Sequence, residues 1–376
     1  MTTADSHEPH RPTFARVDSS ALAGNFRTFR EHAKDARIMA VVKADAYGHG
    51  LLKCAQMFGD LGADYLGVGF VEEGIALRRA GITQPVLVLG GIAGSQIDLF
   101  IENNLEITAS SVFKIEATDS EAKGLGKRAR VHLKIDTGMN RIGQNWRTSE
   151  RLFEAARRCE HVEVVGIYSH LATAEEENTG FAEEQIARFR EVLMQAEAAG
   201  LHPEHKHLCN SAGAIRFPHA HFTMIRPGLG LYGQHASPEL QKKFPLRSAM
   251  SLVSEIVYMK RIRKGESVSY GRVWTAPEDV WIATVPVGYG DGYPRLLSGR
   301  AHVLIGGKRY PIVGTVCMDQ FMVCLGQDRY RVGEPVALWG RQGDQEISLW
   351  DICRPSGFIP YELPIFLTGR VPRVFV

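Results

Sequence analysis

The chain has 376 residues, which is long for a single hydrophobic core, so two domains are expected. Its 44% hydrophobic and 23% charged residues are typical of a globular protein in aqueous solution. The net charge of +2 and the lack of any long lysine or arginine run argue against a nucleic-acid partner. No stretch approaches the length of apolar sequence that spans a bilayer, so no membrane partner is expected either.

The amino-terminal residues 1–12 are polar and contain no apolar segment of the kind found in signal peptides. We predict that they form a disordered tail. The six cysteines have irregular spacing and no CxxC pair, which is typical of reduced thiols rather than of a disulfide framework. Both features predict a cytoplasmic protein.

Between residues 13 and 245, strand-like apolar runs alternate with helix-like patterns. Several runs are continuous apolar stretches, as buried parallel strands require, and the clearest helix, 181–200, places its apolar residues on one face. Eight β/α units of this length predict an N-terminal (β/α)8 TIM barrel, with a doubly wound open sheet as the alternative. The predicted strands cover residues 38–44, 65–70, 85–90, 106–110, 130–136, 162–170, 207–211 and 223–228.

After about residue 246 the pattern changes. Short strand-like runs such as LVSEIVYMKRI, VWIATVPVGYG and VCMDQFMVCLG are separated by glycine, proline and charged turns, without a long helical pattern. Residues 246–376 are therefore predicted to form a mostly antiparallel β-domain.

The first predicted strand is followed by a single lysine, Lys43, within AVVKADAYGHG. Taken alone, such a lysine is more simply a side chain that extends its ammonium group to water from a strand end. In a TIM barrel, however, active sites lie at the carboxyl ends of the strands, where other polar side chains should gather. The ends of later strands carry Lys134, Arg141, His170, Ser211 and Arg226.

The loops after the last two strands of a TIM barrel commonly bind phosphate. Here they contain the hydroxyl of Ser211 and a turn formed by Gly228, Leu229 and Gly230, whose backbone N–H groups can approach an anion. A lysine on the first strand that faces such a cup is what a pyridoxal phosphate Schiff base requires.

A series of motifs between Phe14 and Val374 resembles, in content and order, the motifs of the alanine racemases, a family of fold-type III pyridoxal phosphate enzymes. The motifs include AVVKADAYGHG, VHLKIDTGMNRIG, NSAG, RPGLGLYG, VSYG and GTVCMDQ. The family fold, a TIM barrel followed by a β-domain, agrees with the two-part pattern. The resemblance implies a homodimeric, pyridoxal 5'-phosphate-dependent racemase that interconverts L- and D-alanine and supplies D-alanine for cell-wall peptidoglycan.

The resemblance also implies two catalytic residues. Lys43 would hold the cofactor as an aldimine and would then act as the base for the D-enantiomer. Tyr270 would be the base for the L-enantiomer, because racemisation needs one acid/base group on each side of a planar carbanion. A free tyrosine has a pKa near ~10, so Tyr270 would need nearby cations to act as a base at neutral pH.

Further roles are implied in the same way. Arg226 would face the pyridine nitrogen and, as a donor only, would keep it unprotonated. Arg141 would contact the cofactor and the substrate carboxylate, and Lys134 aligns with a lysine that is often carbamylated in the family. Met318 would bind the substrate carboxylate through its backbone; in the family, this residue and Tyr270 come from the second subunit. The remaining cofactor contacts would be Tyr47, His170, Ser211, Gly228 and Leu229.

One departure from the family pattern is Gly369, in IFLTGRVPR, where many relatives have a tyrosine that contacts the phosphate. The wider pocket that this implies leaves open a racemase of broader, alanine and serine, specificity. A fold-type III decarboxylase is a rival, but VSYG and RPGLGLYG argue against it. A non-catalytic pyridoxal phosphate carrier is another, but such carriers lack the β-domain.

Two further patterns have simpler interpretations. DTG at 136–138 resembles an aspartic protease signature, but the sequence contains no second copy. The histidines of HPEHKH (202–207) and FPHAHF (217–222) lack partners at metal-ligand spacing. We therefore predict that they are surface histidines and that there is no metal site.

Overall fold

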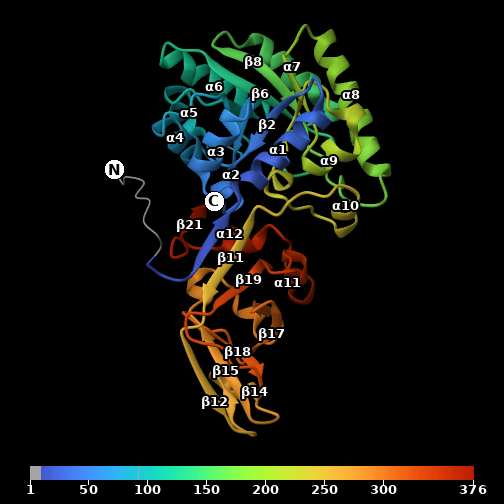
Figure 1. Ribbon diagram of the computed structural model, residues 1–376. Helices are drawn as coiled ribbons and strands as arrows, with labels where there is room; N and C mark the ends of the chain where they lie inside the picture. The colour runs from blue at the N-terminus through green and yellow to red at the C-terminus, as the bar shows by residue number, and fades with distance from the viewer. Residues whose placement is uncertain (1–9, 92) are drawn as a thin grey trace. The chain divides into compact units, whose positions relative to one another are not determined.

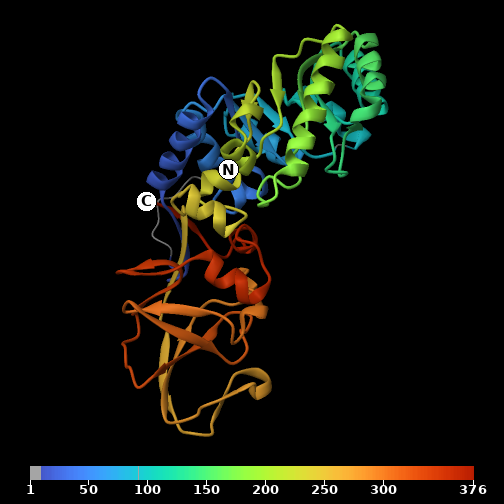
Figure 2. The same cartoon turned by 90° about the vertical axis from the view of Figure 1, so that its right-hand side faces the viewer.

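The computed structural model, drawn in Figures 1 and 2, describes residues 10–91 and 93–376. The chain divides into two compact units. One consists of Leu22–Arg247, and the other joins the described residues up to Ala21 to Ser248–Val376.

The Leu22–Arg247 unit contains a barrel of parallel strands in the order β4-β3-β2-β10-β9-β8-β6-β5. A parallel bridge between Leu87 and Glu106 joins β4 to β5 and brings the two ends of this sheet together. The predicted TIM barrel is thus confirmed in preference to an open sheet. Its strands are β2 (Arg37–Val41), β3 (Tyr65–Val68), β4 (Val86–Val88), β5 (Ile107–Ala109), β6 (Ala129–Asp136), β8 (Val162–Tyr168), β9 (His205–His207) and β10 (Met224–Ile225), and a short β7 (Gln144–Asn145) pairs with β6.

Helices lie on the outer side of the barrel and alternate with its strands (Figures 1 and 2). Because both faces of each strand are covered, strands such as β3 are buried at every residue, which explains their continuous apolar sequences. The helices of this part of the chain are α1 (Ser19–Ala33), α2 (Lys43–Tyr47), α3 (Leu51–Asp60), α4 (Val71–Arg79), α5 (Ile97–Glu102), α6 (Val112–Gly124), α7 (Ser149–Arg158), α8 (Gly180–Ala198), α9 (Ser211–Arg216) and α10 (Pro238–Lys243).

The second unit is built on a mostly antiparallel sheet, as predicted, in the order β12-β15-β18-β17-β16-β19-β11-β1-β21. Strands such as β11 and β18 alternate buried and half-buried residues, the pattern of a sheet with one face against a core. Its strands are β1 (Phe14–Val17), β11 (Met250–Glu255), β12 (Tyr258–Ile262), β15 (Val280–Val285), β16 (His302–Ile305), β17 (Lys308–Val313), β18 (Phe321–Gly326), β19 (Pro335–Gln342), β20 (Gln345–Ile347) and β21 (Arg373–Phe375); β13 (Ser267–Val268) pairs with β14 (Trp274–Thr275), and helices α11 (Leu349–Ser356) and α12 (Glu362–Phe366) complete the unit.

The start of the chain differs from the sequence-based expectation. Strand β1 pairs with β11 and β21, so residues 14–17 belong to the C-terminal sheet and not to the barrel. Of the predicted tail 1–12, residues 1–9 lie outside the described residues. Arg11, however, donates hydrogen bonds to the buried carboxylate of Asp291 at 2.5 and 2.7 Å, so this part of the tail prediction is wrong.

Among the residues that the structure describes, no helix has the length and apolar character needed to cross a membrane. All six cysteines are free.

Candidate active site

The segment that follows β2 carries Lys43 to the carboxyl end of the barrel. Strand β2 ends at Val41, and after Lys43 the backbone makes a left-handed turn in which Ala44, Asp45, Ala46 and Tyr47 have φ angles of 53° or 54°. Gly48 then closes the turn, because its N–H group donates to the carbonyl of Ala44 at 2.9 Å.

Positively charged and titratable groups converge at this end of the barrel. Burial lowers the pKa of His170 well below its ordinary value, and the charges of Arg226, Lys134, Arg141 and Lys43 lower it further. Because four cations from four different loops or strands act on one imidazole, the five predicted residues lie in one region. Burial, and then the charge of Arg141, also lower the pKa of Lys43, which favours its neutral amine.

Lys134 is a buried cation within this group. Its side chain projects from β6, and its ammonium nitrogen lies 4.4 Å from the centroid of the Tyr168 ring. Burial and the charges of Arg226 and Arg141 lower its pKa well below that of an ordinary lysine. A lowered pKa favours the neutral amine, which is the form that reacts with carbon dioxide, so the environment of Lys134 is compatible with carbamylation.

Arg226 is held by acceptors at both terminal nitrogens of its guanidinium. One terminal nitrogen, Nη1, donates to Nδ1 of His207 at 3.0 Å. The other, Nη2, donates to the carbonyls of Ser169 and Leu208 at 2.9 and 3.1 Å and to Nδ1 of His170 at 3.1 Å. Burial lowers its pKa to about 10, so the guanidinium remains charged at neutral pH.

A chain of hydrogen bonds leads from Arg226 through the interior of the barrel. Because arginine can only donate, Nδ1 of His207 must accept, so its Nε2–H donates to Nδ1 of His132 at 2.8 Å. The Nε2–H of His132 then donates to Oε2 of Glu106 at 2.7 Å. Burial opposes ionisation of Glu106, but the bond from His132 and the charge of Arg130 lower its pKa.

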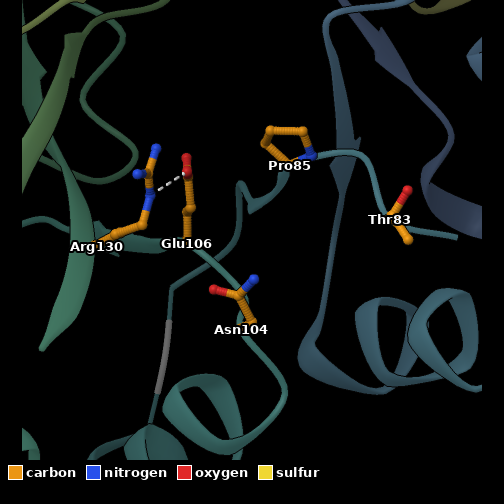
Figure 3. A pocket seen from close by; sticks show the side chains of 5 residues that line it. All are labelled: Thr83, Pro85, Asn104, Glu106 and Arg130. Carbon is orange, nitrogen blue, oxygen red and sulfur yellow. Dashed lines mark hydrogen bonds and ion pairs between the residues drawn. The ribbon is translucent and has the colours of Figure 1, made fainter. Parts of the chain in front are cut away.

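The chain ends at the amino-terminal end of the barrel, opposite the candidate site. Glu106 precedes β5 and accepts a hydrogen bond from Nε of Arg130, near the start of β6, at 2.8 Å (Figure 3). Both side chains line a pocket of about 220 Å³ together with Thr83, Pro85 and Asn104. Since these residues either precede their strands or, like Arg130, lie at the start of one, the pocket is separate from the carboxyl-end cluster.

A cradle of small and hydroxyl-bearing residues lies beside the left-handed turn. The hydroxyl oxygen of Ser211 accepts hydrogen bonds from the N–H groups of Gly228 and Gly230 at 2.9 and 3.1 Å. A Cβ atom added to Gly228 would lie 2.5 Å from the hydroxyl oxygen of Tyr47. Only glycine at position 228 therefore allows the Tyr47 side chain to lie this close to the backbone. The four residues predicted to contact the phosphate come together here: Tyr47, Ser211, Gly228 and Leu229.

The predicted residues of the C-terminal unit lie close to each other. Tyr270 begins a short 3-10 turn and is 73% exposed, and its carbonyl accepts a hydrogen bond from Thr315 at 2.9 Å. Met318, three residues after Thr315 in the chain, is 52% exposed. The preceding Ser269 donates to the carbonyl of Thr315 at 2.7 Å, so the two segments are tied together.

Sequence reasoning missed several residues of this arrangement. The prediction that the histidines of 202–207 and 217–222 lie on the surface is wrong for three of them, because His205, His207 and His221 are buried. His207 lies on β9 inside the barrel, where alternation along the HKH strand is the only signal that could have placed it. His132, within β6, and Glu106, just before β5, were missed because a single polar residue in or beside an apolar run gives no local sign that it is buried.

An (β/α)8 barrel with a separate antiparallel β-domain defines the structural class, and comparisons with known proteins give the family. The chain matches the family model of the alanine racemase N-terminal domain over residues 17–236 and that of the C-terminal domain over residues 249–375. The chain therefore belongs to the alanine racemase family.

Individual relatives cover nearly the whole chain. It is 42% identical to the alanine racemase of Symbiobacterium thermophilum over 366 residues, which are 97% of each chain. It is 40% identical to the alanine racemase of Geobacillus kaustophilus, covering 98% of this chain and 95% of that one.

Solved structures agree with the sequence comparisons. The crystal structure of alanine racemase from Streptomyces lavendulae has a TM-score of 0.93 at 35% identity and covers 98% of both chains. The alanine racemase of Bacillus anthracis with bound L-Ala-P has a TM-score of 0.93 at 36% identity, over 98% of this chain and 96% of that one.

Proposed function

We propose that this chain is a pyridoxal phosphate-dependent racemase that interconverts L-alanine and D-alanine. The names of the relatives support the reaction, and one observation in the structure supports the cofactor. Lys43, with a lowered pKa, lies four residues before Tyr47, whose hydroxyl reaches the cradle formed by Ser211 and Gly228. An imine-forming amine and a cradle for the phosphate are the two features by which such enzymes hold their cofactor.

The other residues at the barrel mouth fit the same cofactor. Arg226, a donor that stays charged, is suited to a ring nitrogen without a proton. His170, kept neutral by burial and by surrounding cations, can pack against an aromatic ring. Leu229, with Gly228, would hold the phosphate, and Arg141, which is exposed, would contact the phenolic oxygen and the substrate carboxylate.

The bound cofactor supplies an electron sink for the negative charge that develops when the substrate loses its Cα proton. Lys43 then moves the proton on the face that gives D-alanine, and its lowered pKa makes a neutral amine available for this task. Tyr270 moves the proton on the opposite face. Two bases on opposite faces allow the proton to leave one side and return on the other, which is the requirement for racemisation.

Arg226 would limit the reaction to racemisation: as a donor only, it would leave the ring nitrogen of a bound cofactor unprotonated, which would weaken the electron sink and disfavour transamination. The hydrogen-bonded chain to Glu106 supports this role, because it holds the guanidinium through Nη1 and brings no acidic proton donor to the barrel mouth. Carbamylation of Lys134 would convert a buried cation into an anion that orients Arg141. Met318 contributes backbone to the substrate carboxylate.

We further propose a homodimer with shared active sites. Tyr270 and Met318 are large side chains left more than half exposed. Two hydrogen bonds to Thr315 join the Ser269–Tyr270 segment to the segment that carries Met318. Exposed catalytic groups of this kind would complete the site of a second copy. Such a dimer would act in the cytoplasm, for which the six free cysteines are suited, and would supply D-alanine for peptidoglycan.

A broader racemase that also accepts serine is the second candidate. The observation that favours it is Gly369, which is exposed and has no described atom within 4 Å of an added Cβ. The space that a tyrosine would fill in other members of the family is therefore open in this unit.

The test is to purify the protein and look for the visible absorption of a lysine-bound cofactor. Loss of optical activity is then followed for a panel of L- and D-amino acids, including alanine and serine. Racemisation of alanine that disappears in Lys43→Ala together with the absorption band supports the proposal. Retention of both the absorption band and the racemase activity in Lys43→Ala would contradict the proposed function.

A further inference from the structure

The turn that follows Lys43 has an unusual backbone. Four consecutive residues, Ala44–Tyr47, are left-handed, and none of them is glycine. Side chains with a Cβ disfavour this conformation, so such a run persists only where its surroundings hold it in place. Because the turn joins Lys43 to Tyr47, its shape sets the spacing between the amine and the phosphate cradle.

Glu73, in the first turn of α4, holds the start of this turn. Its Oε1 accepts the N–H group of Ala44 at 2.7 Å, and its Oε2 accepts the N–H group of Gly69 at 2.7 Å. Gly69 follows β3, and Ala44 lies beyond the end of β2. One carboxylate therefore joins the ends of two adjacent barrel strands at the point where Lys43 leaves the barrel.

The same carboxylate lies beside the side chain of Lys43. A Cβ added to Gly69 would lie 3.3 Å from Oε2 of Glu73 and 3.6 Å from Cβ of Lys43, so both side chains cover the same glycine. Burial and the charges of Arg141 and Arg226 lower the pKa of Lys43, whereas the charge of Glu73 raises it. Glu73 is thus the negative charge that opposes the two arginines.

We propose that Glu73 is a positioning residue for Lys43, which fixes the left-handed turn through Ala44 and supplies the charge that balances the arginines beside the amine. This inference rests on the proposed function, in which Lys43 binds the cofactor. Capping of α4 would account for the bond to Gly69. It would not account for the bond to Ala44, which lies in another segment of the barrel mouth.

The experiment compares the wild-type full-length protein with Glu73→Gln, Glu73→Asp and a matched control, Glu72→Gln. Glu72 is the neighbouring acidic residue in the same helical turn, and it is exposed. The first readout needs no cofactor: Lys43 in protein stripped of cofactor is labelled with an amine-acylating reagent across a pH series, and its peptide is quantified by mass spectrometry. The second readout is the dissociation constant for added pyridoxal phosphate.

In Glu73→Gln, the labelling midpoint of Lys43 should move about one pH unit down, because loss of a nearby negative charge favours the neutral amine. Pyridoxal phosphate should bind about tenfold more weakly, because one N–H acceptor is replaced by an amide donor. Glu73→Asp should keep the labelling midpoint near that of the wild type but weaken cofactor binding, because it keeps the negative charge but is too short to bond both Ala44 and Gly69. This variant therefore separates the effect of the charge from that of the two hydrogen bonds. Glu72→Gln should change neither quantity.

The inference is overturned if Glu73→Gln lowers only the unfolding temperature and leaves both readouts at the wild-type values. If Glu73→Gln does not accumulate as folded protein, Glu73→Asp decides the matter, because unchanged cofactor affinity with the shorter side chain would exclude the bridge. Failure of the proposed function has a different signature. In that case the wild type itself would bind no pyridoxal phosphate, while the labelling midpoints would still report on Glu73.

Discussion

The candidate residues of the barrel and those of the C-terminal unit lie in opposite environments. At the barrel mouth, Lys134 and Arg226 are 4% exposed, and their pKa values are lowered by burial. In the C-terminal unit, Tyr270 and Met318 are 73% and 52% exposed. The barrel therefore sets the chemistry of its own groups through desolvation and neighbouring charges, whereas Tyr270 and Met318 are largely open to solvent.

This contrast leads to an asymmetry between the two proposed bases. Changes in the barrel should affect cofactor binding and catalysis together, because the same cluster performs both. Changes at Tyr270 should affect catalysis while the cofactor remains bound. The predictions that follow test this asymmetry, beginning with the largest expected effect.

Replacement of Lys43 should abolish both functions of the barrel cluster. We expect Lys43→Ala to lose racemase activity in both directions by at least about 10⁴-fold, because it removes the covalent attachment and one of the two bases. Activity is measured by polarimetry, and attachment by borohydride reduction and mass spectrometry. Lys123→Ala, at an exposed lysine in the last turn of α6, is the control and should match the wild type.

Replacement of Tyr270 should leave the barrel cluster intact. We expect Tyr270→Phe to lower activity by about 10²- to 10⁴-fold, the usual range for a general acid/base, with an unchanged absorption spectrum. A loss of bound cofactor in this variant would contradict the contrast between the two regions.

Mixing the two inactive variants tests whether the sites are shared. If Tyr270 serves the partner's barrel, random exchange of Lys43→Ala and Tyr270→Phe subunits produces mixed dimers with one intact site. Activity should then recover to about a quarter of the wild-type value, because half of the dimers are mixed and half of their sites are intact. A mixture that exchanges subunits but stays inactive would mean that each chain completes its own site.

A smaller change tests the phosphate cradle. In Gly228→Ala the added Cβ meets the hydroxyl of Tyr47 at 2.5 Å, so one of the two must move. Overpacking of this size should weaken pyridoxal phosphate binding by about 10- to 100-fold with little effect on the C-terminal unit. Gly124→Ala, where an added Cβ meets no described atom within 4 Å, is the matched control and should bind as the wild type does.

The sequence specified much of this arrangement, but not all of it. Each of the eight predicted strands overlaps a barrel strand, because apolar runs that end in polar loop residues are a local signal, and the strand ends pointed to Lys43 and Arg226. The seventh was misplaced, however: it was predicted at 207–211 and shares only His207 with β9 (His205–His207). The hydrogen-bonded chain from His207 to Glu106 could not be predicted, since its three members meet only when β9, β6 and β5 come together in the barrel. The same reason hid Glu73, which looks like an ordinary acidic residue in the first turn of a helix.

Acid should destabilise the barrel more than the C-terminal unit. Burial lowers the pKa of His205 to about 4, and burial with the charge of Arg226 lowers that of His207 well below its ordinary value. Between about 4 and about 6.5 the unfolded chain binds a proton at His205 that the folded barrel does not, and His207 acts in the same direction, so the free energy of unfolding falls as the pH decreases. For His205 the loss by pH 5.5 is about 1.4 kcal/mol.

Urea unfolding between pH 8 and pH 5 measures this loss, and hydrogen exchange assigns it to a region. The barrel amides should lose protection before those of the C-terminal unit. His205→Gln should flatten the pH dependence by removing one of the contributing groups. An equally steep curve in that variant, or earlier opening of the C-terminal unit, would show that the buried histidines do not control acid stability.

The smallest expected effect concerns Gly369, which lies in the exposed region rather than in the barrel. An added Cβ meets no described atom there, so Gly369→Tyr should fold normally and should fill space that the proposed site leaves open. Serine differs from alanine by one hydroxyl group, and the enzyme can accept it only where there is space for that group. Because the added tyrosine fills such space, the ratio of serine to alanine kcat/KM should fall by about threefold to tenfold. Gly343→Tyr, at a glycine with equally open surroundings in the turn between β19 and β20, controls for the general cost of a surface tyrosine, although its positive φ of 61° adds backbone strain. A serine-to-alanine ratio that Gly369→Tyr leaves unchanged would mean that specificity resides wholly in the desolvated barrel mouth, and that the exposed region supplies a base without selecting the substrate.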